Sequence, residues 1–437
     1  MNNQHFQQAL PHVQKLSNSR GVTLLLGTDA HIGREGVDQE TRVCMTPAQI
    51  WKLKEWLKDA GIALNFYVIA GAGLRSGYTD QDYRDVDGQV IQEDHLPNLR
   101  VAVDVVHALK EPCDYETLIP GSFIRIGALH TGIFDATSGI AALLLKRNFC
   151  AVFDGSAIGN FSFKIDGGYP IPVRSSMSVF AGSIAADIVL NNLKPSEKSY
   201  KISIVGGGTV GVSALNRLLE KKQNSCVEIH IIESRKEKCE DLRQRYKDNS
   251  FVQIKESNRV SSEDLREASG LILATFSPGC PTSKVVDVHN LQEMKEKACV
   301  IDVSADEGGS IACPGGENIT QAIEGLGKDI QYICDTHMPR RYPQEASEAH
   351  GKAILPYLAV LLYLSAREGS GIQAAKYIKQ RDSSTQVDYF EALIHDLQNG
   401  LAFTGPRPIL LNKNVVKSTE SVLKFLDKHN ILYDIYS

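Results

Sequence analysis

A chain of 437 residues is too long for one ordinary hydrophobic core, so its length predicts two domains. Hydrophobic residues at 43% and charged residues at 23% are typical of a soluble globular protein, and a net charge of −5 without a basic block argues against nucleic acid as a partner. Nine cysteines without a C-x-x-C pair, and no apolar run near the roughly 20 residues of a membrane span, predict a cytoplasmic protein with reduced thiols, no metal and no membrane partner.

The first third of the chain follows a polar start of 21 residues that lacks the apolar core of a signal peptide. Strands are predicted at 22–27, 64–71, 101–110, 122–130 and 149–154, and helices at 46–61 and 141–148. Because strands that alternate with helices form crossover units, this pattern indicates a mostly parallel sheet. The Gly-, Pro- and Ser-rich stretch 166–176 is typical of a linker, and a helix is expected at 178–192.

A second alternating series follows, with strands predicted at 201–205, 227–233, 251–255, 270–275, 299–303 and 330–335. Beyond about residue 345 the chain is expected to be helical again, and the helix at 354–368 is apolar around most of its circumference, so a core or a subunit interface should bury it. We therefore expect an α/β protein in which a Rossmann-type domain (171–345) is inserted into a discontinuous substrate domain. The two parts of that domain would be 1–170 and 346–437, the latter with a C-terminal extension, and each domain would hold a mostly parallel sheet.

The strongest local motif is the glycine loop of "KISIVGGGTVGVSALNRLLEKK", where Gly206, Gly208 and Gly211 form G-x-G-x-x-G between an expected strand and an expected helix. In dinucleotide-binding proteins the first glycine allows the tight turn and the second lets the backbone approach a pyrophosphate. The third permits close packing of the helix on the strand. We expect cofactor contacts at Gly206, Gly208, Thr209, Val210 and Gly211; the alternative is a glycine-rich turn that binds nothing.

The strand after this loop ends in Glu233, 22 residues beyond Gly211, where a carboxylate would bond the adenosine ribose hydroxyls. An acid there favours NAD, because the 2′-phosphate of NADP would meet a like charge, although Arg235 nearby leaves NADP open. A second loop, "LATFSPGCPTS" at 273–283, follows another strand end. It either contacts the cofactor, with Ser277 as the candidate, or serves as a plain connector.

Three basic side chains in the first third are candidates for substrate chemistry. Arg42 precedes a helix that Thr46 would cap and Pro47 would start, and its forked guanidinium could clamp a carboxylate. Lys110 ends one expected strand and His130 ends the next, so neighbouring parallel strands would bring them to one edge of the sheet. An arginine, a lysine and a histidine suit a 2-oxo acid or an amino acid. The alternatives are a surface ion pair for Arg42, a solvent-exposed end for Lys110 and a core role for His130.

Several motifs in order then resemble one family, that of alanine dehydrogenase, the transhydrogenase α-subunit and lysine-forming saccharopine dehydrogenase. "RVCMTP" is similar to the family's R-V-A-L-T-P, and "AGAGLRSGYTDQDY" to its glycine-rich stretch. "ALKEP" and "ALHTG" resemble its lysine and histidine motifs, and "GGGTVG" matches its nucleotide loop. "VIDVSADEGG" and "HMPRRYP" resemble V-I-D-V-A-x-D-Q-G-G and N-M-P-x-x-x-P, so the resemblance extends from about residue 40 to 365.

The resemblance implies roles for four residues. Arg42 and Lys110 would hold the substrate carboxylate and carbonyl, and His130 would be the general acid and base. Asp306 would lie near the nicotinamide and the reacting carbon; without the family it would be read as a cap or turn residue. The resemblance also implies a homo-oligomer.

The chain departs from the family at several charged positions. Glu307 stands where the family has glutamine, and His337 stands where it has asparagine. Arg125 lies on the histidine strand, and Arg340 and Arg341 follow His337. The segment "GTDAHIGREGVDQE" is inserted near the N-terminus, and about 70 residues follow the last match. This extra charge favours a substrate larger or more polar than alanine, unless these side chains face solvent.

We therefore expect an NAD(P)-dependent dehydrogenase that interconverts an amino or imino acid with a 2-oxo acid and an amine. One alternative is a saccharopine-type reaction, in which a second amino acid is the amine and extra arginines bind its second carboxylate. An alternative of another class is a nucleotide-binding subunit that transfers hydride without a small-molecule substrate of its own.

Overall fold

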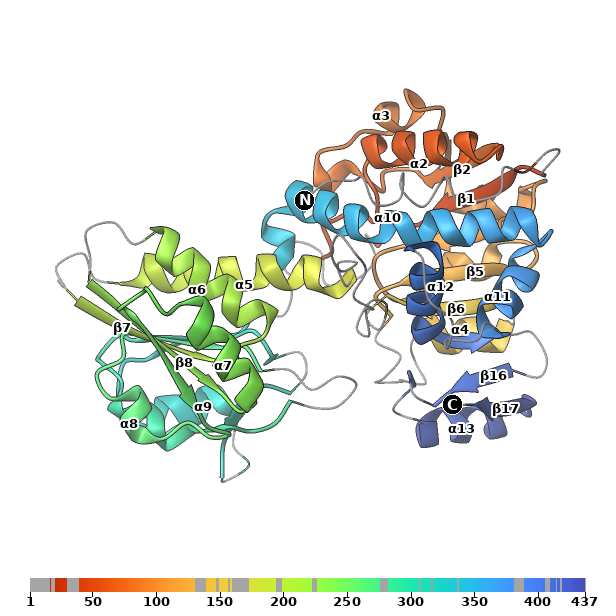
Figure 1. Ribbon diagram of the computed structural model, residues 1–437. Helices are drawn as coiled ribbons and strands as arrows, with labels where there is room; N and C mark the ends of the chain where they lie inside the picture. The colour runs from red at the N-terminus through yellow and green to blue at the C-terminus, as the bar shows by residue number, and fades with distance from the viewer. Residues whose placement is uncertain are drawn as a thin grey trace. The chain divides into compact units, whose positions relative to one another are not determined.

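The computed structural model of the chain describes residues 16, 20–29, 39–129, 139–146, 149–155, 158, 173–193, 199–221, 226–275, 282–305, 308–314, 316, 318–335, 338–380, 389–404, 409–413, 415–416 and 419–436. It has two compact units (Figure 1): unit 1 comprises residues 1–176 and 342–437, and unit 2 comprises residues 177–341. Unit 2 is thus inserted into the sequence of unit 1.

In the described part of unit 1, nine strands form one sheet in the order β17-β16-β15-β6-β5-β4-β1-β2-β3. All neighbouring pairs are parallel except those that β15 makes with β6 and β16. The strands are β1 (Val22–Leu26), β2 (Leu64–Ile69), β3 (Gln89–Ile91), β4 (Val105–His107), β5 (Phe123–Gly127), β6 (Phe149–Asp154), β15 (Leu401–Thr404), β16 (Ile409–Asn412) and β17 (Tyr433–Tyr436).

Helices cover both faces of this sheet, because its central strands are apolar on both sides, as parallel strands usually are. Successive residues of β1 point to opposite faces: Val22, Leu24 and Leu26 belong to a core that also contains residues of α2, α10, α11 and α12, whereas Leu25 belongs to a second core with residues of η4, α4 and α13. The helices of unit 1 are α2 (Pro47–Asp59), η2 (Leu74–Ser76), α3 (Asp80–Arg84), η3 (Glu93–Asn98), η4 (Asp114–Leu118), α4 (Gly139–Lys146), α10 (Pro343–Arg367), α11 (Gly371–Gln380), α12 (Tyr389–Gly400) and α13 (Thr419–Lys428).

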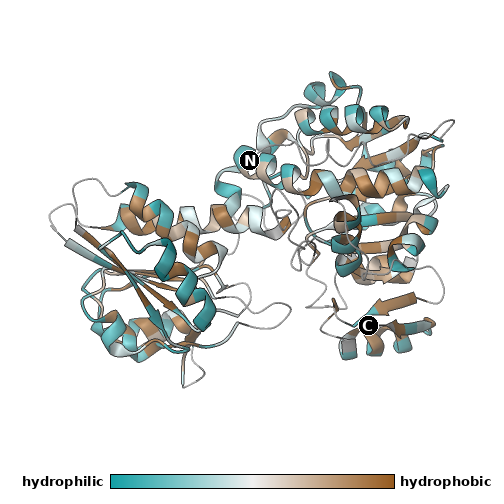
Figure 2. Ribbon diagram, viewed as in Figure 1, coloured by the Kyte–Doolittle hydropathy of each residue, from teal (hydrophilic) through white to brown (hydrophobic). Residues whose placement is uncertain are grey.

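The long helix α10 is the centre of one of these cores. By length and composition it could cross a membrane, yet 83% of its most apolar window is buried inside the protein. Figure 2 shows hydrophobic residues along much of this helix and along the strands of both units. The predicted burial of the helix at 354–368 is therefore confirmed, and the core of unit 1 accounts for it.

Unit 2 contains a six-stranded parallel sheet in the order β14-β12-β10-β7-β8-β9, with a small β11-β13 pair beside it. This is the strand order of a Rossmann-type sheet, with β7 first. The strands are β7 (Ser199–Val205), β8 (Cys226–Glu233), β9 (Val252–Glu256), β10 (Gly270–Leu273), β11 (Val286–Asp287), β12 (Cys299–Asp302), β13 (Ile311–Ala312) and β14 (Gln331–Ile333). The helices are α5 (Val173–Asn192), α6 (Thr209–Lys221), α7 (Lys236–Arg245), α8 (Ser262–Leu265), η5 (Val288–Glu293), α9 (Ile319–Glu324) and η7 (Met338–Arg341). The predicted fold class is confirmed.

Three details of the prediction are wrong. The strand expected at 101–110 extends only from Val105 to His107. The expected linker 166–176 lies outside the described residues up to 172, and residues 173–176 begin α5. The region beyond 345 is not purely helical, because β15, β16 and β17 extend the sheet of unit 1. These strands have four residues each, too few for alternation to distinguish them from loops.

Candidate active site

The candidate site lies at one edge of the sheet in unit 1. Strands β1, β4 and β5 are neighbours and parallel, with Leu26 opposite His107 and His107 opposite Ile126. Their carboxyl ends therefore meet at the same edge, and the loops that leave them lie side by side. These loops carry Asp29 and Lys110; His130 follows β5 but lies outside the described residues. The expected pairing of the lysine and histidine strands is confirmed.

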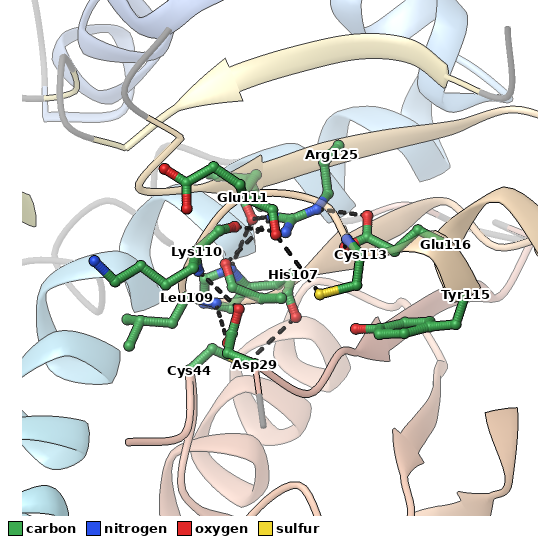
Figure 3. A network of polar contacts seen from close by, with 12 residues as sticks. Asp29, Cys44, His107, Leu109, Lys110, Glu111, Cys113, Tyr115, Glu116 and Arg125 are labelled. Atoms are coloured by element: carbon green, nitrogen blue, oxygen red, sulfur yellow. Dashed lines mark hydrogen bonds and ion pairs between the residues drawn. The ribbon is translucent and has the colours of Figure 1, made fainter. Parts of the chain in front are cut away.

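Lys110 lies in the loop after β4, and protein side chains hold its backbone (Figure 3). Asp29 accepts the N–H of Leu109 on Oδ2 at 2.7 Å and that of Lys110 on Oδ1 at 2.9 Å. On the other side, Arg125 Nη2 donates to the carbonyl of Lys110 at 2.8 Å. After β4 ends, Ala128 still donates to the carbonyl of Leu109 at 2.9 Å, but the N–H groups of Leu109 and Lys110 and the carbonyl of Lys110 bond to side chains instead of a strand. The half-buried Lys110 side chain extends away from this network.

Arg125 is fully buried in an ion pair with Glu116. From the sequence alone, Arg125 was expected to add charge near the substrate. Its Nε lies 2.7 Å from Glu116 Oε2, and both side chains are 0% exposed. Nη1 donates to the carbonyls of Ile126 at 2.6 Å and Ala108 at 3.3 Å. Burial opposes its charge, but the Glu116 carboxylate outweighs burial and raises the pKa of Arg125. Arg125 therefore binds protein groups and supplies no argument for a polar substrate.

The arginines after His337 are also paired within the protein. Arg341 Nε donates to Asp335 Oδ2 at 2.8 Å, and Arg340 Nη2 lies 3.7 Å from Asp335 Oδ1. Asp335 is buried, so it needs this positive charge. A second substrate carboxylate would have to compete with Asp335 for either arginine.

Arg42 is buried in a two-point ion pair with Glu40. Its Nε lies 2.7 Å from Oε1 and its Nη2 lies 2.6 Å from Oε2. Burial opposes ionisation of Glu40, but Arg42, with a further contribution from Lys110, lowers the pKa of Glu40 to about 2. The charge of Lys110 thus acts on the Glu40–Arg42 pair. As expected, Thr46 caps α2, where its N–H donates to Gln49 Oε1 at 2.8 Å, and Pro47 is the first helical residue.

Two histidines beside this region were not anticipated from the sequence. His350 on α10 stacks on His107 of β4, with ring centroids 5.7 Å apart. Burial lowers the pKa of His107 to about 4 and, together with the neighbouring ring of His107, lowers that of His350 well below its usual value. Both rings are therefore neutral near pH 7. Arg42 and Glu40 also act electrostatically on His350, in opposite directions.

In unit 2 the glycine loop has the geometry of a dinucleotide site. Gly206 has φ +102°, and a Cβ there would come within 2.5 Å of the carbonyl oxygen of Ala274. A Cβ on Gly211 would overlap the carbonyl oxygen of Gly206, whereas one on Gly208 would meet no protein atom within 4 Å. The backbone at Gly208 is therefore open to a ligand, as close approach of a pyrophosphate requires. Thr209 and Val210 are the first residues of α6, whose N-terminus follows this loop.

Glu233 ends β8 and faces the glycine loop. Its Oε2 accepts the N–H of Gly207 at 2.8 Å, and its Oε1 accepts Nε of Arg235 at 3.0 Å. Burial opposes ionisation, but the hydrogen bonds from Arg235 and Gly207 outweigh it and lower the pKa of Glu233 to about 2. A negative charge at this position fits ribose hydroxyls and repels a 2′-phosphate. The residues present fit NAD.

Two more predicted site residues, Ser277 and Asp306, lie outside the described residues, as do Glu307 and His337. Their roles stay predictions. The segments that flank Asp306 are held by Asp302 at the end of β12, whose Oδ1 accepts the N–H of Ser304 at 3.0 Å and whose Oδ2 accepts that of Ser310 at 3.1 Å.

The residues that sequence reasoning missed are mainly partners of the candidates. Glu40 precedes Arg42 by two positions, so a local pairing was readable from "ETR". Asp29 follows the first predicted strand, and the edge argument that placed Lys110 would have placed its carboxylate at the same edge. Glu116 and His350 gave no such signal, because their contacts depend on tertiary packing.

Comparisons with known proteins identify what this architecture resembles. A family model described as "Alanine dehydrogenase/PNT, N-terminal domain" matches residues 31–152, and one described as "Alanine dehydrogenase/PNT, C-terminal domain" matches residues 187–380. The alanine dehydrogenase of Bacillus subtilis (strain 168) is 26% identical over 386 residues, which cover 84% of this chain and 94% of that protein. A Staphylococcus epidermidis alanine dehydrogenase is 22% identical over 356 residues, which cover 77% and 88% respectively.

Two solved structures share the fold. An L-alanine dehydrogenase superposes with a TM-score of 0.66 at 21% identity, covering 93% of this chain and 100% of that one. A transhydrogenase from Sinorhizobium meliloti superposes with a TM-score of 0.59 at 17% identity, covering 79% and 96% respectively.

Proposed function

Because the chain belongs to the alanine dehydrogenase/PNT family, we propose that it is an NAD-dependent dehydrogenase that interconverts an amino acid with a 2-oxo acid and an amine. Within the described residues, the observation that supports the proposal is that the charge of Lys110 acts on the buried, ion-paired Glu40. A separate unit supplies an open glycine loop and an ionised Glu233 for the cofactor. The expected cytoplasmic location and homo-oligomeric state stay predictions.

In this proposal each side chain has one task. Arg42 attracts the substrate carboxylate, which would share the guanidinium with Glu40, and Lys110 stabilises negative charge that develops on the carbonyl oxygen. In the oxidative direction, His130 removes a proton from the water that attacks the imine carbon, and the product is released as a 2-oxo acid and an amine. Bound NAD supplies the acceptor for the hydride from the α-carbon.

Ammonia fits the described residues better than a second amino acid as the amine. The saccharopine-type alternative rests on additional arginines that would bind a second carboxylate. Arg125 is committed to Glu116, and Arg340 and Arg341 are committed to Asp335. The same pairings weaken the argument from charge for a substrate more polar than alanine, so small and apolar 2-oxo acids belong among the candidates.

Lys110→Ala tests the proposal. We expect it to abolish turnover of NADH with a 2-oxo acid and ammonia and to leave the dissociation constant of NADH unchanged, because the glycine loop belongs to the other unit. His130→Ala should behave in the same way. Full activity in both variants would contradict the assigned site.

A further inference from the structure

The hydrogen bonds around the loop after β4 point to a positioning residue that the proposed chemistry does not name. We propose that the ionised carboxylate of Asp29 fixes the position of Lys110, so that protonation of Asp29 loosens the lysine from its working position. The part of this inference that concerns catalysis rests on the proposed function; the part that concerns the loop does not.

Asp29 holds the loop through both of its oxygens. Oδ2 accepts from the N–H of Leu109 at 2.7 Å, and Oδ1 accepts from that of Lys110 at 2.9 Å. Asp29 is 3% exposed, so water does not offer these N–H groups an easy substitute. Removal of either acceptor would leave a buried donor unsatisfied next to the proposed catalytic lysine.

Arg125 completes the clamp from the opposite side. It donates to the carbonyl oxygen of Lys110 at 2.8 Å and to that of Ala108 at 3.3 Å. The carboxylate of Asp29 thus faces N–H groups, and the guanidinium of Arg125 faces carbonyl groups, of one short loop (Figure 3). Each charge therefore lies at the end of the peptide dipoles that it attracts. Protonation of Asp29 would turn one accepting oxygen into a hydroxyl, and that oxygen would then face an N–H donor.

The ionisation of Asp29 falls within an accessible range of pH. Burial raises its pKa to about 6, although Arg125 and the N–H groups of Lys110 and Leu109 lower it, and Glu40 adds a further increase. The other titratable groups that interact with Asp29 in the described residues are Cys44, Cys113 and Tyr115. Burial raises the pKa of each of them, so they stay neutral while Asp29 titrates.

Stability and function should respond to this titration in opposite directions. A carboxyl whose pKa is raised by folding stabilises the fold at acid pH, and that contribution is lost as pH rises through about 6. The ordered position of Lys110 needs the ionised carboxylate of Asp29, so this order is gained as pH rises through about 6. If Asp29 affected activity only through stability, activity would fall as pH rises through about 6, whereas the positioning role predicts that activity rises.

The test compares Asp29→Asn with Asp104→Asn in the full-length protein. Asp104 precedes β4 at the other end of the strand, is 5% exposed, and accepts the N–H of Thr23 at 2.9 Å, so it is a matched buried aspartate away from the site. Amide hydrogen exchange at Leu109 and Lys110, corrected for intrinsic rates, should accelerate about tenfold or more in Asp29→Asn at pH 7.5. It should stay at the wild-type value in Asp104→Asn. Unchanged exchange in Asp29→Asn would overturn the inference.

A second readout is the pH profile of kcat/KM for the 2-oxo acid. In the wild type it should fall below about pH 6 with an ionisation that Asp29→Asn lacks, and the variant should be lower by about 10- to 100-fold at pH 7.5. Identical profiles would overturn the catalytic part. Faster exchange in Asp29→Asn without turnover of any 2-oxo acid by the wild type would overturn the proposed function and support the role of Asp29 in the loop.

Discussion

Replacing Arg125 by methionine should destabilise unit 1 strongly, because it leaves the Glu116 carboxylate buried without its partner. Both side chains are 0% exposed, and Nε and Oε2 lie 2.7 Å apart. Breaking such a pair from one side costs about 3–5 kcal/mol. In the double variant Glu116→Gln/Arg125→Met neither member of this pair is charged, so about 2 kcal/mol of that loss should return. The remainder should persist, since the carbonyls that Arg125 contacts lose a charged donor.

Urea unfolding followed by tryptophan fluorescence measures this effect. The two tryptophans of the chain, Trp51 and Trp56, both lie on α2, and Trp56 is 3% exposed, so their signal reports on unit 1. We expect the midpoint for Arg125→Met to fall by roughly 1 M or more. Lys54→Met is the matched control, because it breaks the ion pair with the exposed Asp87, and exposed pairs contribute little to stability.

One result would refute the structural role of Arg125. If Arg125→Met were as stable as Lys54→Met but changed the preference among 2-oxo acids, the guanidinium would have to face the substrate. Equal stability of the single and double variants would contradict the ion pair itself, because the charge left on Glu116 would then have no measurable cost.

Three further changes test the other parts of the site. Glu233→Gln should weaken NADH binding about tenfold and narrow the preference for NADH over NADPH, because a hydrogen bond to a charged group contributes about 1.5–3 kcal/mol. In a fluorescence titration, the same dissociation constant of NADH for the variant and the wild type would contradict this. Glu40→Gln should lower the free energy of unfolding by about 3 kcal/mol near pH 7 by removing the carboxylate that pairs with the buried Arg42. Because the folded-state pKa of Glu40 is depressed from 4.5 to about 2, the difference from wild type in urea unfolding should shrink as pH falls through that range, and a constant difference would argue against the pair. Gly208→Ala should keep its melting temperature and lose NADH affinity, whereas Gly211→Ala should melt earlier; wild-type NADH binding by Gly208→Ala would exclude the loop as the cofactor site.

The centres of both sheets were predictable from the sequence, because parallel strands are buried on two faces and read as continuous apolar runs. The run 22–27 and the strand 270–275 belong to this class. The end of β4 was not predictable in the same way. Ala108 and Leu109 are as apolar as a strand and still bond to Ile126 and Ala128 at 3.4 and 2.9 Å, but the N–H groups of Leu109 and Lys110 bond to Asp29 and the carbonyl of Lys110 bonds to Arg125.

The sequence was enough to name candidate residues for the site, but not to predict the contacts that these residues make. Residue type, and position after a strand or before a helix, were enough to select Lys110, Arg42 and Glu233. Their partners could not be chosen in advance when they lie far away in sequence: Asp29 is 81 positions from Lys110. Arg125 is an example: from the sequence, its charge suggested a polar substrate, but in the structure it pairs with the buried Glu116.

The most direct test of the proposed function is NADH oxidation with a panel of 2-oxo acids, each supplied with ammonia or with a second amino acid such as lysine or glutamate. We expect turnover with ammonia alone, strongest for one 2-oxo acid, and loss of that turnover in Lys110→Ala. Turnover only with a second amino acid would move the protein to the saccharopine-type reaction. Tight NADH binding without turnover of any acid would contradict the proposal that Lys110 and Arg42 bind a substrate.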